Sequence, residues 1–264
     1  MKLGLQLWTV RDMLAQDPER TFAAVRSAGY EGVELPCDFD QIMPPDRLLR
    51  LLAQNNLTLL GATLTAEQIA AGEWDDLLSY YRVVSCPALV CAGIFSVPGN
   101  AQGWRDIAAQ FQAFGQRCAQ DGIRFLYHIH GHEFTNVDGQ RGIDHLLEAL
   151  DPACAGIEAD IYWIKWGGAD PAELIRRYFS LFDAVHLKDT CDASAPERFR
   201  DTEVGAGVLD IPEILRLCAA RGLEWVIVEQ EAFDLEPEQS IQISAQNITA
   251  LIGALALSSG KENA

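Results

Sequence analysis

The sequence predicts a single-domain (β/α)8 TIM barrel, and three observations favour this α/β fold class. Short apolar runs alternate with amphipathic segments along the 264-residue chain, which is typical of a parallel sheet built from βα units. Eight such runs are present, the number that closes this kind of barrel. No stretch rich in Pro, Gly or Ser divides the chain, so we expect one domain over residues 1–257 and a disordered tail at 258–264.

The eight expected strands are apolar runs bounded by residues that favour turns. Gly29, Gly122 and Gly222 each precede such a run directly, because glycine tolerates the left-handed backbone that ends a helix. Asp17 and Asp170 precede Pro and Glu residues, which is typical of the first turn of a helix. The expected strands span residues 2–8, 30–35, 57–63, 88–92, 123–128, 155–160, 184–187 and 224–229.

Composition narrows the classes of partner. The chain carries 20 Lys and Arg against 38 Asp and Glu, a formal net charge of −18 that would repel a phosphate backbone, so we expect no nucleic-acid partner. The seven cysteines include no Cys-x-x-Cys pair, which favours reduced thiols. The N-terminus has no leader-like pattern, and no apolar run approaches the roughly 18 residues of a membrane span. We therefore expect a cytoplasmic protein with no membrane partner.

Ionisable residues stand at or just after the ends of four consecutive expected strands. Because the carboxyl ends of parallel strands meet at one face of a barrel, we expect these side chains to form one site. Three carboxylates and one imidazole would suit one divalent cation, Mn²⁺ first, with Mg²⁺, Co²⁺ and Zn²⁺ left open. Two of them, Glu133 and Glu229, would flank a substrate carbon and transfer its proton. The four predicted metal ligands are Glu133, Asp160, His186 and Glu229.

The histidines near the fifth strand raise a question of phase. His128, His130 and His132 alternate, so a regular strand would point all three to one face and Glu133 to the other. Glu133 reaches the ion only if the backbone breaks phase, and Gly131 would allow that. On this interpretation His128 is only a hydrogen-bonded neighbour. An alternative is that a His-x-His pair binds zinc directly, as in amidohydrolase-type barrels.

Other residues near strand ends are candidates for substrate contacts. Trp8 and Trp163 would wall the apolar face of a substrate, or else they pack in the core. Glu34 ends the second strand and is a further candidate. Glu158 shares the phase of Asp160, so it would lie beneath the ion and need a cationic or protonated partner. Arginines in the long loop between residues 189 and 207 would be solvated or would bind a substrate phosphate.

Motifs over nearly the whole chain resemble the xylose-isomerase-like TIM barrels of the sugar phosphate isomerase/epimerase family. Residues 127–134, Tyr-His-Ile-His-Gly-His-Glu-Phe, resemble that family's Tyr-His-Asn-His-x-x-Glu-Phe motif. Residues 186–189 resemble its His-Leu-Lys-Asp motif, and residues 203–207 its Glu-x-Gly-x-Gly turn. The resemblance implies the same metal site, glutamate acid/base catalysts, and a polyol-like substrate in contact with His130 and Lys188.

Two departures from the family pattern affect the expected substrate. Ile129 replaces the Asn between the two histidines. The ketose 3-epimerases place a His three residues after the sixth-strand Asp, whereas Trp163 stands there in this chain. The main hypothesis is therefore a metal-dependent carbohydrate isomerase or epimerase that works through an enediolate. The alternative is a lyase or dehydratase that acts on a keto-sugar or keto-inositol by the same enolisation.

Two further hypotheses belong to other classes. An apurinic-site nuclease shares this barrel, but it needs several metal ions and a cationic surface, which the acidic composition disfavours. A barrel that binds a sugar without converting it is the other alternative. The sequence leaves a homo-oligomer open.

Overall fold

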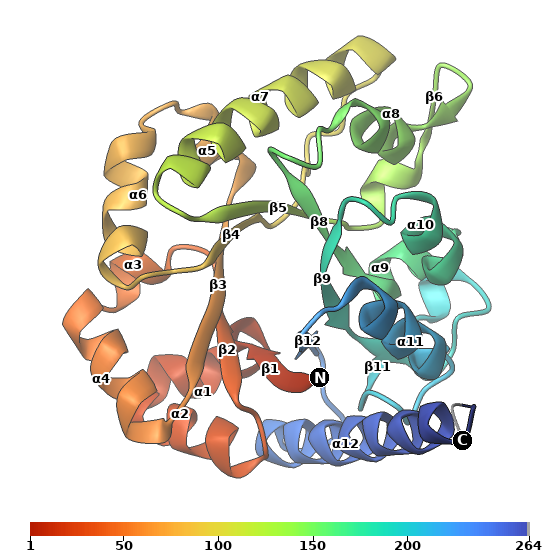
Figure 1. The fold of residues 1–264 in the computed structure, drawn as a ribbon. Helices are drawn as coiled ribbons and strands as arrows, with labels where there is room; N and C mark the ends of the chain where they lie inside the picture. The colour runs from red at the N-terminus through yellow and green to blue at the C-terminus, as the bar shows by residue number, and fades with distance from the viewer. Residues whose placement is uncertain (263–264) are drawn as a thin grey trace.

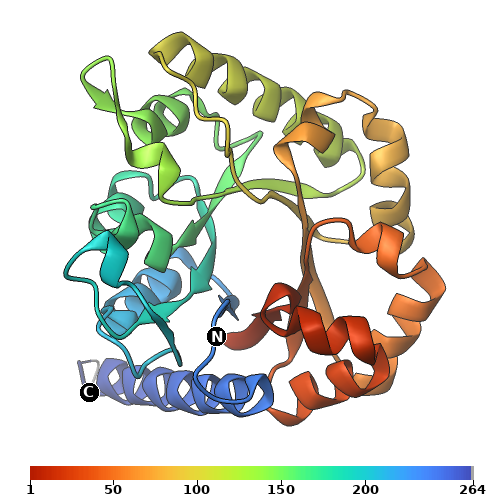
Figure 2. The ribbon, with the colours of Figure 1, turned by 180° about the vertical axis from the view of Figure 1, so that it is seen from behind.

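A closed barrel of eight parallel strands forms the centre of the protein in a computed structural model that describes residues 1–262 (Figure 1). The strands follow one another around the ring in the order β1-β12-β9-β8-β5-β4-β3-β2, so chain neighbours are also neighbours in space. Helices surround the barrel, as the view from behind also shows (Figure 2). The predicted TIM barrel fold is confirmed.

Each expected strand is present, although some ends differ. The first strand ends at Gln6 rather than Trp8, because the Gln6 side chain accepts a hydrogen bond from the Trp8 backbone N–H and starts a 3-10 helix there. The barrel strands are β1 Lys2–Gln6, β2 Gly32–Leu35, β3 Thr58–Leu64, β4 Ala88–Cys91, β5 Arg124–His128, β8 Gly156–Asp160, β9 Phe182–Leu187 and β12 Trp225–Val228.

The helices begin where the sequence predicts caps. The side chains of Asp17, Asp170 and Asp210 each accept a hydrogen bond from a backbone N–H in the following first turn. The helices are α1 Arg11–Gln16, α2 Pro18–Ser27, α3 Phe39–Ile42, α4 Pro45–Asn55, α5 Ala66–Ala70, α6 Trp74–Val83, α7 Ala101–Gln120, α8 Gly142–Ala149, α9 Ile161–Trp166, α10 Pro171–Arg177, α11 Ile211–Arg221 and α12 Pro237–Glu262, with 3-10 helices η1 Leu7–Val10, η2 His132–Phe134 and η3 Pro196–Arg198.

The loops at the carboxyl ends of the strands contain two small hairpins. β6 Asn136–Val137 pairs with β7 Gln140–Arg141, and β10 Asp189–Thr190 pairs with β11 Asp201–Thr202. The second hairpin belongs to the long loop predicted between residues 189 and 207. Asp189 holds that loop, because its carboxylate accepts hydrogen bonds from the backbone N–H groups of Gly205, Gly207 and Leu209.

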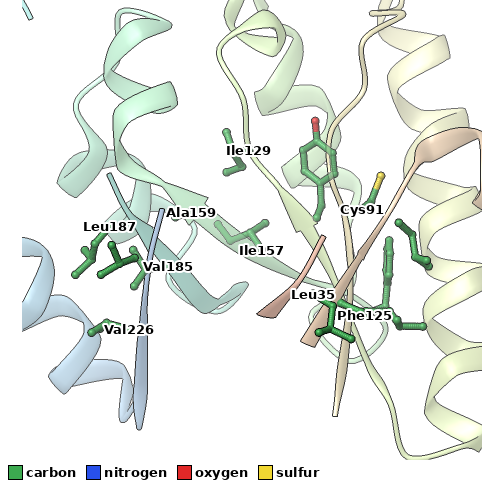
Figure 3. Packing of buried hydrophobic residues seen from close by; sticks show 14 of the residues in the cluster. Leu35, Cys91, Phe125, Ile129, Ile157, Ala159, Val185, Leu187 and Val226 are labelled. Carbon is green, nitrogen blue, oxygen red and sulfur yellow. The ribbon is translucent and has the colours of Figure 1, made fainter. Parts of the chain in front are cut away.

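The main apolar core lies between the strands and the helices. Alternate strand residues face outward, and Phe125 of β5 packs edge to face with Phe111 and Phe114 of α7 at 5.3 and 5.1 Å between ring centroids. Figure 3 shows part of this core, with Phe125, Ile157 and Val185 among the labelled side chains. The inward-facing residues of the same strands are left to form the site.

Helix α12 corrects one expectation. Over Pro237–Leu257 it is long and apolar enough to cross a membrane by length and composition alone, whereas the sequence was expected to contain no such run. The helix packs against α2 and α11, and Ile241, Ala245 and Ile248 are buried in the structure. One such helix is a weak indication, because core helices pass the same test. Residues 258–262 continue α12, and the last two residues of the expected disordered tail lie outside the described residues.

Candidate metal centre

Four ionisable side chains converge inside the carboxyl end of the barrel: His128 of β5, Asp160 of β8, His186 of β9, and Glu229, which follows β12. One ligand atom from each lies within 4.8 Å of the others, and all four residues are at most 7% exposed. Atoms bound to a single ion at about 2.0–2.2 Å lie up to about 4.4 Å apart. Small side-chain shifts would therefore close this cluster around a cation.

Two buried atoms of the cluster make no hydrogen bond within the described part of the chain: Oδ2 of Asp160, and Nδ1 of His186, which lies 3.4 Å from Oε2 of Glu229. Oδ1 of Asp160 accepts hydrogen bonds from the N–H groups of Tyr162 and Trp163 at 2.9 and 3.1 Å, which caps helix α9 and directs Oδ2 toward the cluster. Buried polar atoms in native proteins nearly always have partners. A cation at this point would satisfy both atoms, so the residues present fit a metal ion.

Two carboxylates lie behind the imidazoles. Oε2 of Glu158 is 2.8 Å from Nδ1 of His128 and 3.1 Å from Nε2 of His186. Oε1 of Glu34 is also 3.1 Å from Nε2 of His186, and it accepts a hydrogen bond of 2.5 Å from the Gln6 side chain. Metal-binding histidines commonly donate their second ring N–H to a carboxylate, which orients the free nitrogen toward the ion. The partner that the sequence required for Glu158 is therefore this pair of histidines.

Glu133, predicted as a ligand, lies outside this cluster. Its Oε1 accepts hydrogen bonds from the Tyr127 hydroxyl and from the backbone N–H of His130, the latter at 3.1 Å. The ring of Tyr127 packs against Phe111 of α7, so Glu133 lies on the helix side of the barrel wall. The structure thus brings together three of the four predicted ligands and adds His128, which had been interpreted as only a hydrogen-bonded neighbour.

Strand phase accounts for this difference. His128 points into the barrel and Tyr127 points out, as period-two alternation requires. Gly131 does not bring Glu133 back to the inner face. A Cβ atom at Gly131 would lie 2.1 Å from the Trp166 ring, so this glycine permits close packing instead.

The substrate contacts predicted from the sequence divide into two groups. His130, Trp8 and Trp163 line a cavity of about 390 Å³ above the cluster. Glu34 and Lys188 are each 1% exposed and lie in the layer beneath and beside the cavity. Lys188 pairs with Glu231, lies 4.0 Å from Oε2 of Glu229, and is 4.9 Å from the ring centroids of Tyr162 and Trp163.

Several cavity residues were not predicted. They come from strands β1 and β3 and from the loops after β2, β4, β5 and β12. Of these residues, Phe95 could most readily have been predicted to line the site. A large aromatic residue between Gly93 and Gly99 indicates an exposed loop. The unpredicted lining residues include Gln6, Cys37, Thr63, Phe95, His132 and Glu231.

No Lys or Arg is among the described residues that line the cavity. Nε of Arg198 binds Asp192 at 2.5 Å, and Arg200 donates to the backbone carbonyls of Glu197 and Phe199. Neither loop arginine is placed to bind a phosphate on a ligand in this cavity.

Charge in the cluster is unevenly distributed. Burial raises the pKa of Asp160 to about 7 and lowers the pKa of His128 to about 3. Burial alone would also lower the pKa of His186, but Glu158 and Glu34 outweigh it and hold that pKa well above its usual value. Burial would raise the pKa of Glu229, yet the imidazole of His186, 3.4 Å away, and the charge of Lys188 lower it strongly.

These shifts predict that Mn²⁺ affinity rises with pH. Without metal, Asp160 holds a proton below a pKa of about 7, and the raised pKa of His186 keeps its ring protonated at neutral pH. Both protons must leave when a cation binds, so below the pKa of each group the affinity should rise by about tenfold per pH unit for each proton displaced. Calorimetric titrations between about pH 6 and 8, in buffers of different ionisation enthalpy, would count these protons. Affinity that is constant over this range would contradict the prediction.

A closed βα barrel with a buried cluster of imidazoles and carboxylates at its carboxyl end defines an α/β-barrel protein with a candidate metal centre. The sequence model of the xylose isomerase-like TIM barrel family matches residues 22–251. The chain belongs to this family, as the sequence motifs predicted.

Two curated relatives illustrate the similarity. The inosose dehydratase of Geobacillus kaustophilus is 29% identical over 142 aligned positions, gaps included, which cover 48% of this chain and 46% of that protein. The chain thus matches about half the length of that relative. Inosose dehydratase 2 of Bacillus cereus is 25% identical over 271 aligned positions, gaps included, which cover 88% of this chain and 90% of the relative.

Solved structures are similar at the level of the fold. A sugar phosphate isomerase/epimerase from Parabacteroides distasonis superposes with a TM-score of 0.81 at 20% identity, covering 93% of this chain and 92% of that one. The IolI protein with a bound zinc atom has a TM-score of 0.72 at 15% identity, covering 96% and 99%.

Proposed function

We propose that the protein is a metal-dependent enzyme that enolises a ketone with neighbouring hydroxyl groups, either a keto-sugar or a keto-cyclitol. The observation that carries this proposal is the convergence of His128, Asp160, His186 and Glu229, with Glu34 and Glu158 behind the imidazoles. Two imidazoles and two carboxylates suit Mn²⁺ and also Zn²⁺. The zinc atom in the IolI structure supports a divalent ion of this kind.

The residues around the cluster have distinct proposed roles. Glu229 remains ionised because its pKa is strongly lowered, and it takes the proton from the carbon beside the ketone. A bound cation would supply Lewis-acid polarisation of the carbonyl oxygen. Lys188 stays protonated because Glu229, Asp160 and Glu231 raise its pKa despite burial, and its Nζ lies 4.0 Å from Oε2 of Glu229, so it holds that carboxylate ionised and in place. His130, Trp8 and Trp163 hold the substrate ring.

Dehydration is the favoured result of this enolisation. The enolate expels the hydroxyl group on the next carbon, Glu229 returns to that hydroxyl the proton that it took, and one water molecule leaves. The curated relatives named inosose dehydratase support this choice, as does the absence of Lys and Arg among the described lining residues, since an inosose is uncharged. The similarity to a sugar phosphate isomerase/epimerase supports isomerisation or epimerisation as the second candidate.

Product mass separates the two candidates. Mn²⁺-loaded protein would be incubated in D₂O with a keto-inositol and with unphosphorylated ketohexoses, and the products followed by mass spectrometry and NMR. Loss of one water indicates the dehydratase, whereas unchanged composition with one deuterium incorporated indicates the isomerase or epimerase. If the metal-loaded protein catalyses neither exchange nor water loss with either class of ketone, the proposed function is wrong.

A further inference from the structure

A second buried carboxylate lies close to the metal centre and takes no part in it. Glu133 is 0% exposed and belongs to η2, the 3-10 helix that follows β5. Its Oε1 accepts hydrogen bonds from the hydroxyl of Tyr127 and from the backbone N–H of His130. Its Oε2 has no hydrogen-bond partner within the described residues. Glu133 is neither among the residues that line the cavity nor in either candidate ligand cluster.

The two groups that Glu133 binds lie on either side of a ligand histidine. Tyr127 is fixed by its position in β5 and by its ring contact with Phe111 of α7, at 5.5 Å between centroids. His130 follows the end of the strand, where its N–H has no barrel strand to pair with. Glu133 therefore closes residues 127–133 into a compact loop that is tied to the barrel wall.

That loop presents two imidazoles to the site. His128 lies between the two anchor points and offers Nε2 to the metal cluster, while His130 lines the cavity. Their ring centroids are 4.6 Å apart, so a movement of one ring displaces the other. Gly93 adds a constraint, because a Cβ atom there would lie 2.7 Å from Nδ1 of His130. The position of both rings depends on the path of the backbone between Tyr127 and Glu133.

We propose that Glu133 is a positioning residue. It holds the strand end so that His128 reaches the cation and His130 reaches the substrate, and it transfers no proton itself. This inference rests on the proposed metal centre. It reverses the expectation from sequence that Glu133 is both ligand and acid/base catalyst, since its carboxylate lies on the helix side of the wall, bound to Tyr127.

Three variants test the proposal. Glu133→Gln keeps an oxygen that can accept from both donors, so we expect metal Kd and kcat within about threefold of wild type. Glu133→Ala removes the acceptor and should weaken Mn²⁺ binding by about 10–100-fold, the usual effect of losing an outer-shell partner. It should also raise KM, while kcat at saturating metal and substrate changes less. Tyr127→Phe removes one of the two donors and should change Kd in the same direction by a smaller factor.

A proton-transfer role gives the opposite pattern. If Glu133→Gln lowers kcat by about a hundredfold or more while metal Kd is unchanged, Glu133 is catalytic and the proposal is overturned. Unchanged metal Kd in Glu133→Ala would also overturn it. Circular dichroism and the thermal midpoint would establish folding, and if Glu133→Ala does not fold, the Gln and Phe variants still decide between the two roles.

Hydrogen exchange separates this inference from the proposed function. Faster amide exchange in the peptide that contains residues 128–133 is expected in Glu133→Ala and Tyr127→Phe, and it requires neither metal nor substrate. If wild-type protein binds no divalent ion, the proposed function fails even where exchange accelerates. If exchange in this peptide is unchanged in both variants, the positioning role fails even where metal binds.

Discussion

Asp160→Asn is expected to abolish measurable Mn²⁺ binding while the barrel stays folded. An Asn side chain keeps an oxygen that can accept from Tyr162 and Trp163, so the cap of α9 is preserved. Its amide nitrogen would replace Oδ2, the unpartnered atom that faces the cluster, and an amide nitrogen does not bind a cation. The loss of affinity should exceed the roughly 10–100-fold effect of an outer-shell change. Calorimetric titration with Mn²⁺ and Zn²⁺ would measure it.

The chain contains a matched control for this variant. Asp170 caps α10 in the same way, by accepting a hydrogen bond from the N–H of Glu173 at 2.9 Å, but it is exposed and lies outside the cluster. Asp170→Asn should therefore leave metal affinity unchanged. If Asp160→Asn binds Mn²⁺ as tightly as Asp170→Asn does, the metal centre is misplaced.

The fold was predictable because local and global signals agree in this chain. Glycines such as Gly222 end helices immediately before strands, and Asp caps such as Asp17 begin helices after loops. Each βα unit could thus be recognised by itself, and eight of them leave the closed barrel as the simplest arrangement.

The long helix α12 was missed as a membrane-length segment because its apolar residues are interrupted by polar ones such as Gln242.

The site was predictable only in part. Asp160, His186 and Glu229 stand at strand ends, and the topology of the barrel brings such positions together. The choice between His128 and Glu133 depended on whether Gly131 breaks the alternation of the strand, and simple period two would have selected His128. The glutamate was chosen because three carboxylates suit a hard cation, and the family motif implied the same site, although a motif records which residues recur and not what each one binds.

Contacts between strands were beyond the reach of the sequence. Glu158 could be placed beneath the ion from its phase with Asp160, but its bonds to His128 and His186 depend on the relative positions of three strands. The same holds for Glu34, which was predicted to touch substrate and instead lies behind His186. Register between strands is set by packing over the whole barrel, so no local pattern reports it.

Glu229→Gln is expected to lower kcat by roughly a thousandfold, within the usual range for loss of a general base. A Gln oxygen can still contact the cation, so the variant should bind metal more weakly but should still reach full occupancy at high Mn²⁺ concentration. The activities of variant and wild type must therefore be compared at saturating Mn²⁺. Lys188 and His186 hold the pKa of Glu229 far below its usual value, so the base is fully ionised at neutral pH in the wild type. Gln cannot accept the proton at any pH, and solvent deuterium should no longer enter the substrate.

Glu238→Gln is the control for this substitution. Glu238 pairs with Arg20 in the first turn of α12 and belongs neither to a ligand cluster nor to the lining of the cavity, so its substitution should leave exchange and kcat unchanged. Wild-type rates of deuterium exchange in metal-saturated Glu229→Gln would show that another group removes the proton. His130 would then be the next candidate, because its imidazole lines the cavity. A His130→Gln variant that loses exchange while Glu229→Gln retains it would transfer the role of base to the imidazole.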